Sequence, residues 1–316
     1  MDQRNVTRIA TIHLLGFQIP QSITFLVFFL FLMMYCVTIC GNFLIITLVS
    51  YSKSLHSPMY FFLSQLSIYD ILLSTDILPN MISTVLVKKT VMSFSECLTQ
   101  FYFLVMTESS ECLLLTVMSW DRYLAICKPL HYSLKMNYQV CWILVILCWI
   151  SGFFSVFIYT LTMKKLQICG PNIIDHFFCD FVPIMQLSCS DTTTAHLELT
   201  VLGVFFVILP FFTIFVSYSY IIVTILKIPS ITGRQKVFST CSSHLTVVSI
   251  YYVTLFCVYL APWREETQTL NKLLSLLYTV VTPMINPIIY SLRNKDLKKA
   301  VRKLINNFLR INFNKD

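Results

Sequence analysis

Residues 118–132 read MSWDRYLAICKPLHY, and this stretch decides how the rest of the chain is interpreted. An apolar run that ends at Met118 is followed at once by the charge pair Asp121–Arg122 and then by the polar, proline-containing segment 128–132. Charge at the end of an apolar helix costs free energy unless the charges are paired and close to water. The stretch therefore predicts a membrane helix that ends in an Asp–Arg switch. An ordinary helix end with a solvated ion pair is the alternative.

The composition of the chain is that of a membrane protein, because 56% of its 316 residues are hydrophobic and only 12% are charged. Apolar runs long enough to cross a bilayer recur, and we expect helices because barrel strands would alternate in short segments. The seven predicted spans are 24–50, 59–84, 98–127, 140–162, 197–226, 238–261 and 270–291. The predicted fold class is an all-α, seven-transmembrane helix bundle that forms one domain over residues 1–316.

The basic residues predict the orientation of the bundle. If the amino terminus lies outside, the inner loops and the tail hold fifteen of the twenty-three Lys and Arg residues. Such residues accumulate on the cytoplasmic side, so we expect residues 1–23 to be extracellular and residues 292–316 to be cytoplasmic. The net charge of +8 then suits anionic lipid and an acidic protein surface, and nucleic acid is not an expected partner. Asn5 begins a glycosylation sequon in the outer tail.

Four of the twelve cysteines are expected on the oxidising outer face. Cys97 opens the third span, and Cys169, Cys179 and Cys189 lie in the long loop 163–196. A bond from Cys97 into this loop would pin the loop across the top of the bundle. Four cysteines allow three pairings, and their spacing does not choose among them.

Polar residues at membrane depth predict functional sites. Asp70 lies in the second span, and Glu108 and Glu111 lie close together in the third. Two such carboxylates cannot both ionise at low cost in a dry core, so we expect one to join Asp70 around a cation or proton and the other to line a cavity. Two protonated hydrogen-bonding acids are the alternative. Asn42 of the first span is a candidate partner for Asp70.

The end of the chain carries two further signals. Pro283 and Pro287, with Asn286 between them, are expected to distort the seventh span and to free backbone carbonyls. Apolar residues at helical spacing then alternate with lysine and arginine over residues 297–308. This pattern predicts a basic amphipathic helix on the inner membrane surface.

Six segments, in this order and at seven-helix spacing, resemble the olfactory (odorant) receptors, a family of rhodopsin-like class A G-protein-coupled receptors. They are Gly41-Asn42, 58–63, 118–132, Ser217-Tyr218, 236–245 and 283–294. The stretch 178–192 is similar to the tetrapod-type class (class II) of that family. Ser119-Trp120 and Val253 depart from the Ala-Tyr and the Gly that are usual there.

The resemblance implies a multi-pass plasma-membrane receptor, not an enzyme, that binds a small volatile odorant and activates the stimulatory G protein of the olfactory type. The implied ligand-binding residues are Leu104, Val105, Glu108, Ser109, Leu202, Phe206, Tyr252, Phe256, Tyr259 and Thr279. The implied switch and coupling residues are Asp121, Arg122, Tyr123, Tyr218, His244, Asn286, Pro287 and Tyr290. No cofactor is expected beyond a sodium ion at Asp70 and Glu111. The implied disulfides are Cys97–Cys179 and Cys169–Cys189.

Other classes of function remain as alternatives. A non-olfactory class A receptor for an amine or a peptide is the second choice, since Glu108 on the pocket face favours amines over carboxylic acids. A membrane transporter is a remote alternative, because such proteins more often show two related halves and the sequence has no such repeat. An intramembrane enzyme would need a nucleophile and a base, and Cys241 with His244 is more typical of packing.

Overall fold

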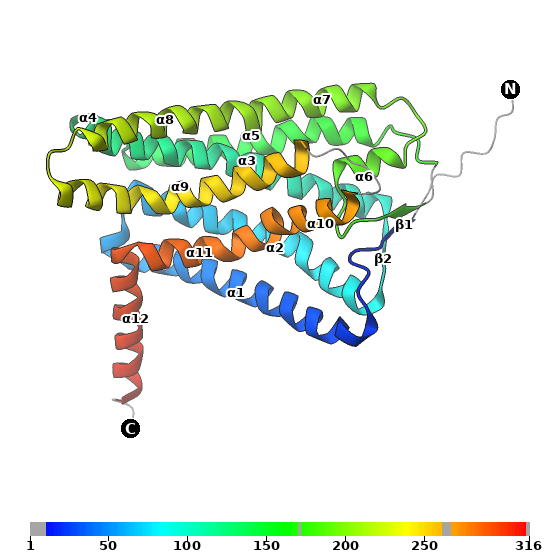
Figure 1. Ribbon diagram of the computed structural model, residues 1–316, viewed down its shortest axis with the longest axis horizontal. Coiled ribbons are helices and arrows are strands. Elements are labelled where there is room, and N and C mark those ends of the chain that lie inside the picture. The colour runs from blue at the N-terminus through cyan, green and yellow to red at the C-terminus, as the bar shows by residue number, and fades with distance from the viewer. Residues whose placement is uncertain (1–10, 170–171, 261–266, 314–316) are drawn as a thin grey trace, which may run out of the picture.

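The structure, a computed structural model, describes residues 11–169, 172–260 and 267–313. Within these residues seven helices are long and apolar enough to cross a membrane, and they form one bundle (Figure 1). They are α1 (Thr24–Tyr51), α2 (Pro58–Val87), α3 (Phe94–Cys127), α5 (Tyr138–Met163), the continuous α7–η3–α8 (Thr193–Gly203, Val204–Ile208, Leu209–Leu226), α9 (Ile231–Leu260) and the continuous α10–η5–α11 (Gln268–Leu276, Leu277–Val281, Thr282–Arg293). All seven predicted spans and the fold class are confirmed.

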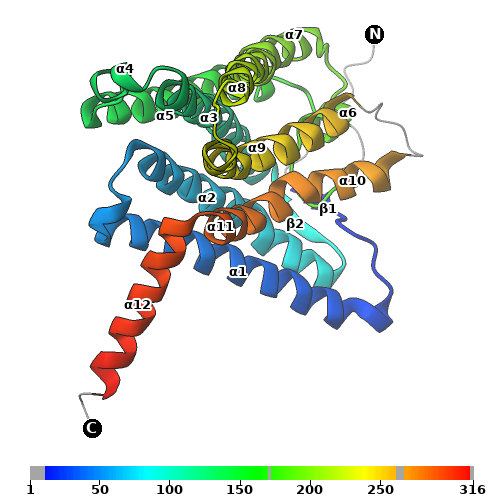
Figure 2. The same ribbon diagram turned by 60° about the vertical axis from the view of Figure 1, so that its left-hand side comes forward.

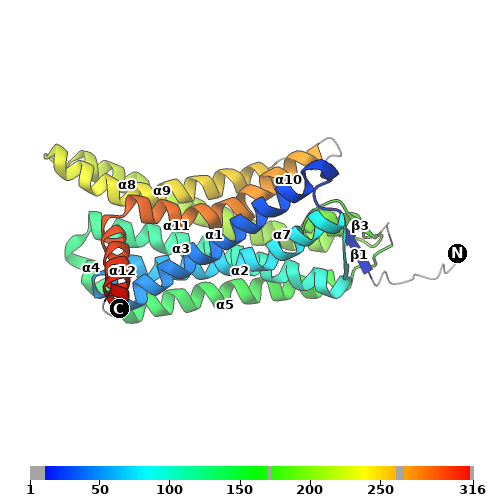
Figure 3. The ribbon, with the colours of Figure 1, turned by 90° about the horizontal axis from the view of Figure 1, so that it is seen from below.

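Shorter elements close the two ends of the bundle. They are β1 (Thr11–Leu14), η1 (Gln21–Ile23), η2 (Lys53–Leu55), β2 (Thr90–Ser93), α4 (Pro129–Lys135), β3 (Ile173–Ile174), α6 (Phe181–Gln186) and α12 (Lys295–Phe313). The strands and α6 lie at one end, and α4 and the start of α12 lie at the other (Figures 1 and 3). We call the first the outer end and the second the inner end. Asn5 lies outside the described residues.

The central helix of the bundle is α3. Ser93 and Glu96 start it with a capping box, in which the Glu96 amide donates to Ser93 Oγ (3.1 Å) and the Ser93 amide donates to Glu96 Oε2 (2.6 Å). The helix ends at Cys127, because Pro129 disfavours helical backbone at the residue before it. In its most apolar window 67% of the residues are buried, against 11% in the helix formed by α7, η3 and α8. Side chains of α3 therefore contribute Glu108, Glu111 and Asp121 to the buried polar groups described below.

Two spanning helices widen into a π turn directly before a proline. η3 ends at Ile208, two residues before Pro210, and η5 ends at Val281, two residues before Pro283. Proline removes one backbone hydrogen bond and its ring collides with the preceding turn, which a wider turn accommodates. Thr282 fills part of the disturbed ladder by donating from Oγ1 to the carbonyl of Leu277 (2.9 Å). The predicted distortion of the seventh span is confirmed.

A three-stranded sheet and two disulfides organise the outer end. β1 pairs antiparallel with β2 and parallel with β3, so the segment before α1 lies between the first outer loop and the loop that follows α5. Cys97 at the start of α3 is bonded to Cys179, with Cα atoms 5.5 Å apart. Cys169 is bonded to Cys189, with Cα atoms 5.7 Å apart. Both pairings are those that the family resemblance implies.

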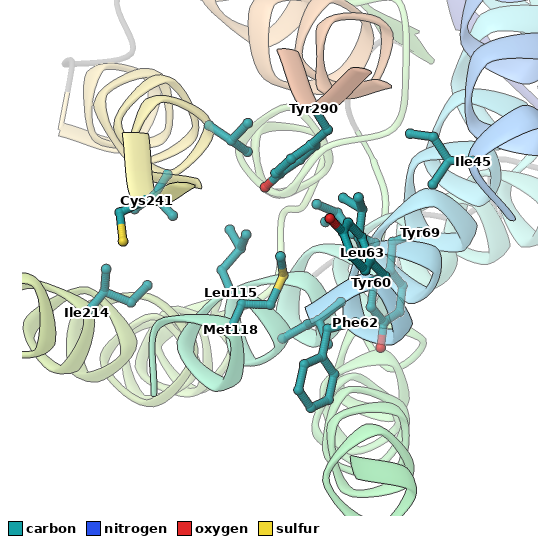
Figure 4. Close-up of a cluster of buried hydrophobic side chains, with 14 of the residues drawn as sticks. Ile45, Tyr60, Phe62, Leu63, Tyr69, Leu115, Met118, Ile214, Cys241 and Tyr290 are labelled. Atoms are coloured by element: carbon teal, nitrogen blue, oxygen red, sulfur yellow. The ribbon is translucent and has the colours of Figure 1, made fainter. Parts of the chain in front are cut away.

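The buried apolar side chains form three clusters. The main cluster joins side chains from most of the spanning helices, including Ile45, Phe62, Tyr69, Leu115, Met118, Ile214, Cys241 and Tyr290 (Figure 4). The loop cluster lies under the disulfide-bonded loop and includes Cys97, Phe101, Tyr159, Cys179, Phe181 and Ile184. The lateral cluster includes Leu73, Ile77, Leu104, Phe177, Phe178, Val258 and Tyr278. The last two clusters show that the loop between α5 and α7 inserts aromatic side chains into the bundle.

The last helix, α12, turns away from the bundle at its inner end (Figure 2). Asn294 starts it, because Asn294 Oδ1 accepts from the amides of Asp296 (2.9 Å) and Leu297 (3.2 Å). Tyr60 of α2 donates to the same oxygen (3.0 Å). Leu297 is fully buried and joins the main cluster, whereas the basic side chains of residues 298, 299, 302 and 303 are exposed. The predicted amphipathic pattern is therefore present in this helix.

Candidate functional site

Glu108 is the most unusual polar residue of the outer half of the bundle. Its side chain points into the bundle and is only 7% exposed. Within the described part of the chain its Oε1 atom has no hydrogen-bond partner. Buried polar atoms are almost always hydrogen-bonded, so this carboxylate oxygen indicates a place for a donor that the described residues do not supply.

The surroundings of Glu108 connect α3 to α9. The hydroxyl of Tyr251 lies 3.4 Å from the backbone oxygen of Glu108 and 3.3 Å from Sγ of Cys112, one helical turn farther along α3. The charged groups that interact with Glu108 are themselves acids: Asp180 first, then Glu111 and Asp76. The two ion pairs found among the described residues, Arg122–Asp121 and Lys272–Asp175, involve none of these. The region therefore holds several acids that have no basic partner among the described residues.

The predicted ligand-binding residues lie where the three apolar clusters approach α3. Leu104 belongs to the lateral cluster, Val105 and Leu202 pack on the loop cluster, and Tyr252 and Phe256 belong to or pack on the main cluster. The adjacent residues Leu104 and Val105 of α3 thus contact different clusters. Glu108, Ser109 and Thr279 are buried. Phe206 lies half-buried in η3, and the side chain of Tyr259 lies outside the described ones.

An aromatic group joins the last two long helices of this region. Phe211 of α8 lies with its ring centroid 5.3 Å from that of Tyr252 and 5.1 Å from that of Phe256, both on α9. Aromatic pairs at these separations are favourable beyond their burial. Phe211 was not among the predicted site residues. Its position four residues before Phe215 gave no signal that separates it from ordinary lipid-facing apolar residues.

The middle site contains Asp70, Glu111 and Asn286, all nearly fully buried. Asn286 Nδ2 donates to both oxygens of Asp70, at 3.0 and 3.1 Å, and the charges of Asp70 and Glu111 interact. The partner of Asp70 is therefore Asn286, and the expectation that Asn42 bonds to it is wrong. Asn42 Nδ2 instead donates to the carbonyls of Thr38 and Pro283, both at 3.1 Å. The expected depth of Asn42 and Asp70 in the membrane does not determine which neighbouring helix the side chain of Asn42 faces.

The inner site is built on the Asp121–Arg122 pair in the last two turns of α3, which ends at Cys127. Arg122 donates to Asp121 Oδ2 from Nη2 and, at 2.8 Å, from Nε. Asp121 is 1% exposed, and its other oxygen accepts from the hydroxyl of Tyr132 on α4 (2.8 Å). Burial and the charge of Asp121 raise the pKa of Tyr132 above its ordinary value, so the hydroxyl stays protonated as a donor. Tyr132 was not predicted as a switch residue, although it closes the stretch 118–132.

A second inner contact links α8 to α9. The hydroxyl of Tyr218 lies 2.6 Å from Nδ1 of His244. The remaining ring nitrogen of His244 is buried and has no hydrogen-bond partner in the described residues, and Arg122 is a charge that acts on this ring. Tyr123 lies against Tyr220 of α8 at 6.0 Å between ring centroids. The structure thus gathers Asp121, Arg122, Tyr218 and His244 at the inner end, while Tyr290 and Pro287 belong to the adjoining α11.

The outer end has a latch that the sequence did not predict. Nζ of Lys272 on α10 donates to the backbone oxygen of Gly16 (2.9 Å) and is paired with Asp175. Gly16 has a φ of 59°, and a Cβ atom there would lie 2.6 Å from Thr84 Cγ2. Its amide donates to the carbonyl of His176 (3.0 Å). We call these contacts of Gly16, Lys272, Asp175 and His176 the outer latch.

The comparisons with known proteins agree with this arrangement. The family model described as olfactory receptor matches residues 31–307. Human olfactory receptor 11L1 is 44% identical over 96% of this chain and 95% of its own length. Human olfactory receptor 10A7 is 45% identical over 95% of each chain, and mouse olfactory receptor 5P55 is 44% identical over 96% of this chain and 98% of its own.

A solved structure gives the fold independently. Squid rhodopsin superposes with a TM-score of 0.73 at 17% sequence identity, over 91% of this chain and 82% of its own length. That likeness shows the seven-helix fold of the rhodopsin-like, class A receptors, and the family match is far closer in sequence. The chain belongs to the olfactory receptor family.

Proposed function

We propose that this chain is a plasma-membrane odorant receptor that binds a small volatile amine beside Glu108 and activates the stimulatory G protein of the olfactory type, which raises cyclic AMP. Membership of the olfactory receptor family supports the odorant and the G protein. The observation that carries the choice of an amine is the buried Oε1 atom of Glu108, which has no partner within the described residues.

An amine satisfies Glu108 better than other volatile groups do. A protonated amine supplies both a positive charge and a hydrogen-bond donor, and charge-assisted hydrogen bonds are about twice as strong as neutral ones. A carboxylic acid would add a further negative group to a region that already holds Glu108, Glu111, Asp76 and Asp180. Like charges at short range are repulsive, and more so away from water.

The remainder of the proposed site is apolar. Leu104 and Val105 lie on this part of α3 and Tyr252 and Phe256 on α9, each in or against one of the three clusters, and Phe211 extends the aromatic surface. Removing the hydrocarbon part of a volatile molecule from water contributes about 0.8 kcal/mol for each buried CH₂ group. Affinity would come mainly from this burial, and selection among volatiles from the polar contact at Glu108.

Signalling follows from the contacts that join the ligand region to the inner end. Tyr251 of α9 touches the backbone of Glu108, and the same helix carries His244, which is held by Tyr218. A ligand that prefers the state in which α9 lies farther from α3 shifts the population toward that state. The opened inner end, with Arg122 released from Asp121, then accepts a helix of the G protein.

The middle site fits a sodium ion. Asp70 and Glu111 supply carboxylate oxygens, and Ser74 on the same helix face as Asp70 has a buried hydroxyl that lacks a partner among the described side chains. Oxygen ligands are those that hard cations prefer. Here the ion would balance the two acids, and Asn286 would hold Asp70 in place from α11. Loss of the ion would let α2, α3 and α11 rearrange.

The proposed orientation places the sheet and the disulfides outside the cell and α12 in the cytoplasm. Disulfides form in oxidising compartments, and both bonds lie at the outer end. The exposed basic face of α12 is suited to the anionic inner leaflet. Asn5 in the preceding tail would then be available for glycosylation.

The test is a cyclic AMP reporter assay in cells that supply the olfactory G protein. Volatile amines, neutral odorants and carboxylic acids of matched chain length are applied to the receptor and to Arg122→Ala, with surface amounts of both measured by antibody staining. We expect amines to give dose-dependent signals that Arg122→Ala abolishes. Strong responses to carboxylic acids, with none to amines, would reject the proposed ligand class.

A further inference from the structure

We propose that the ligand site has a second cation anchor, formed by Asp180 and Glu198 beside Tyr159, so that its preferred ligands carry two basic nitrogens. This inference rests on the proposed function, because the first nitrogen is the one that binds Glu108. The second anchor would take the other nitrogen of an extended diamine, nearer to the outer end of the bundle. Three acids, Glu108, Asp180 and Glu198, have no basic partner among the described residues, and the buried hydroxyl of Tyr159 lies beside two of them.

Glu198 is the acid that α7 brings to this place. Thr162 of α5 donates from Oγ1 to Glu198 Oε1 (3.0 Å), which holds the carboxylate against α5. The other oxygen of Glu198 is buried and accepts no hydrogen bond from the described residues. Carboxylates normally fill this second acceptor position with a donor or with water. The position is therefore open to a donor from a ligand.

Asp180 is the acid that the disulfide-bonded loop brings to the same place. It follows Cys179, which is bonded to α3, and its Oδ1 accepts from the amide of Phe181 (2.7 Å) as the cap of α6. Asp180 is only 2% exposed. The ring of Phe181 lies 5.9 Å from that of Tyr159 on α5, so the loop sets this carboxylate close to the same helix that holds Glu198.

Tyr159 is an independent sign that a polar group is missing. Its side chain is 1% exposed, and its hydroxyl has no hydrogen-bond partner in the described chain. The two charges that act on this hydroxyl are those of Asp180 and Glu198. A buried tyrosine hydroxyl usually finds a partner. An ammonium group between the two carboxylates would donate to both and balance one of their two negative charges, and its remaining hydrogen would point at the available oxygen of Tyr159.

The second anchor communicates with the first. Asp180 is the strongest of the acids that act on Glu108, so the two sites share one region of negative potential along α3. Tyr159 and Phe181 belong to the loop cluster, on which Val105 packs one turn before Glu108. An apolar chain across Val105 would thus join a nitrogen at Glu108 to a nitrogen near Tyr159.

A metal ion is a poorer occupant than a diamine. A divalent cation needs several oxygen or nitrogen ligands that converge on one point. Among the described residues no three His, Cys, Asp or Glu side chains are placed to do so. Separated acids with an apolar stretch between them match an organic molecule that carries its charges at its two ends.

The experiment compares straight-chain primary monoamines with α,ω-diamines of four to about eight carbons in the cyclic AMP assay. In the wild-type receptor we expect the best diamine to act at a concentration about tenfold lower than the monoamine of equal length, as one additional buried charge pair would give. Glu198→Gln should remove this advantage and leave the monoamine response unchanged, and Asp180→Asn should also remove the advantage. Asparagine also caps helices, so Asp180→Asn keeps α6 capped.

Controls separate this inference from the proposed function. Asp191→Asn removes an exposed acid of the same loop and should change neither response, and surface staining shows that each variant reaches the membrane. Equal potency of monoamines and diamines in the wild type would overturn the second anchor alone, as would a diamine advantage that survives both substitutions. Responses to neutral odorants with every amine silent would overturn both amine anchors but keep the receptor.

Discussion

The hydroxyl of Tyr218 on α8 lies 2.6 Å from Nδ1 of His244 on α9, and the pair is buried. The contact joins the inner halves of two helices that must separate before a G protein can enter. Arg122 acts on the same histidine, so one buried group connects both elements of the inner site. We expect this hydrogen bond to restrain basal activity.

Removing the restraint should raise basal signalling. Tyr218→Phe keeps the ring and deletes the hydroxyl, and a buried hydrogen bond contributes about 1 kcal/mol, so the active population should rise about fivefold. The measurement is ligand-free cyclic AMP at matched surface amounts. Tyr220→Phe, which alters an exposed tyrosine two residues farther along α8, is the matched control. Unchanged or lower basal signal in Tyr218→Phe would show that the contact does not hold the inactive state.

The ligand class depends on the charge of Glu108. Glu108→Gln keeps the size and the hydrogen-bonding capacity of the side chain but removes its negative charge. We expect the concentration of amine for half-maximal response to rise at least about tenfold, because the lost interaction is charge-assisted and buried. Responses to neutral odorants should stay within a factor of about two, since they use the apolar contacts. Equal losses for both ligand classes would indicate a packing effect instead.

The outer latch should control how firmly the segment before α1 is held. Lys272→Met removes the donor to Gly16 and the partner of Asp175 but keeps the length of the side chain. Hydrogen bonds from charged donors contribute about 1.5–3 kcal/mol, so the amides of Leu15 and Gly16 should exchange with solvent at least about tenfold faster. Hydrogen–deuterium exchange measures this directly. Lys164→Met, at an exposed outer lysine, should leave the rates unchanged.

The latch also predicts a dependence of stability on pH. Burial and the charge of Lys272 lower the pKa of His176 to about 3. An unfolded histidine has a pKa of about 6.5, so between these values the unfolded chain binds a proton that the folded chain does not. This contribution therefore destabilises the fold as pH falls below about 6.5. Between pH 7 and pH 5, the melting temperature of His176→Phe should fall by less than that of the wild type.

The neighbouring acid Asp180 changes stability with pH in the opposite direction. The effect of His176 is therefore measured as a difference between His176→Phe and the wild type. Burial raises the pKa of Asp180 to about 6, so the folded chain binds this proton first, and stability rises as pH falls from about 6 toward 4. Asp180, Lys272 and Asp175 are present in both His176→Phe and the wild type, so their effects cancel in the difference. Parallel melting curves for the two proteins would contradict the role of His176.

The spans were predictable because each depends on local composition alone. A run of apolar residues long enough to cross a bilayer specifies a helix whatever its neighbours are, and the prolines before which the π turns form are visible in the sequence. The position of Asp121–Arg122 at the end of α3 followed from the same reasoning. The disulfides were correct because of the family resemblance, since spacing left three pairings open.

Contacts between helices were less predictable because they depend on rotation and tilt. Asn42 and Asp70 lie at similar depth, yet Asn42 bonds to the carbonyl of Pro283 and Asp70 to Asn286. The outer latch escaped prediction for a related reason. Lys272 looked like a residue at the edge of a span, and its partners Gly16 and Asp175 lie in distant segments without a motif.

The pairing of β1 imposes an order on biosynthesis. Its partners β2 and β3 lie about 80 and 160 residues later in the chain, so β1 emerges long before the strands that complete its sheet. Four spans must be inserted before the loop that carries β3 reaches the same side of the membrane as β1. The sheet therefore closes late, and it closes only if those spans have been threaded in the correct sense. A chain in which one of those four helices failed to insert would place β3 on the opposite side of the membrane from β1 and leave that pairing unformed.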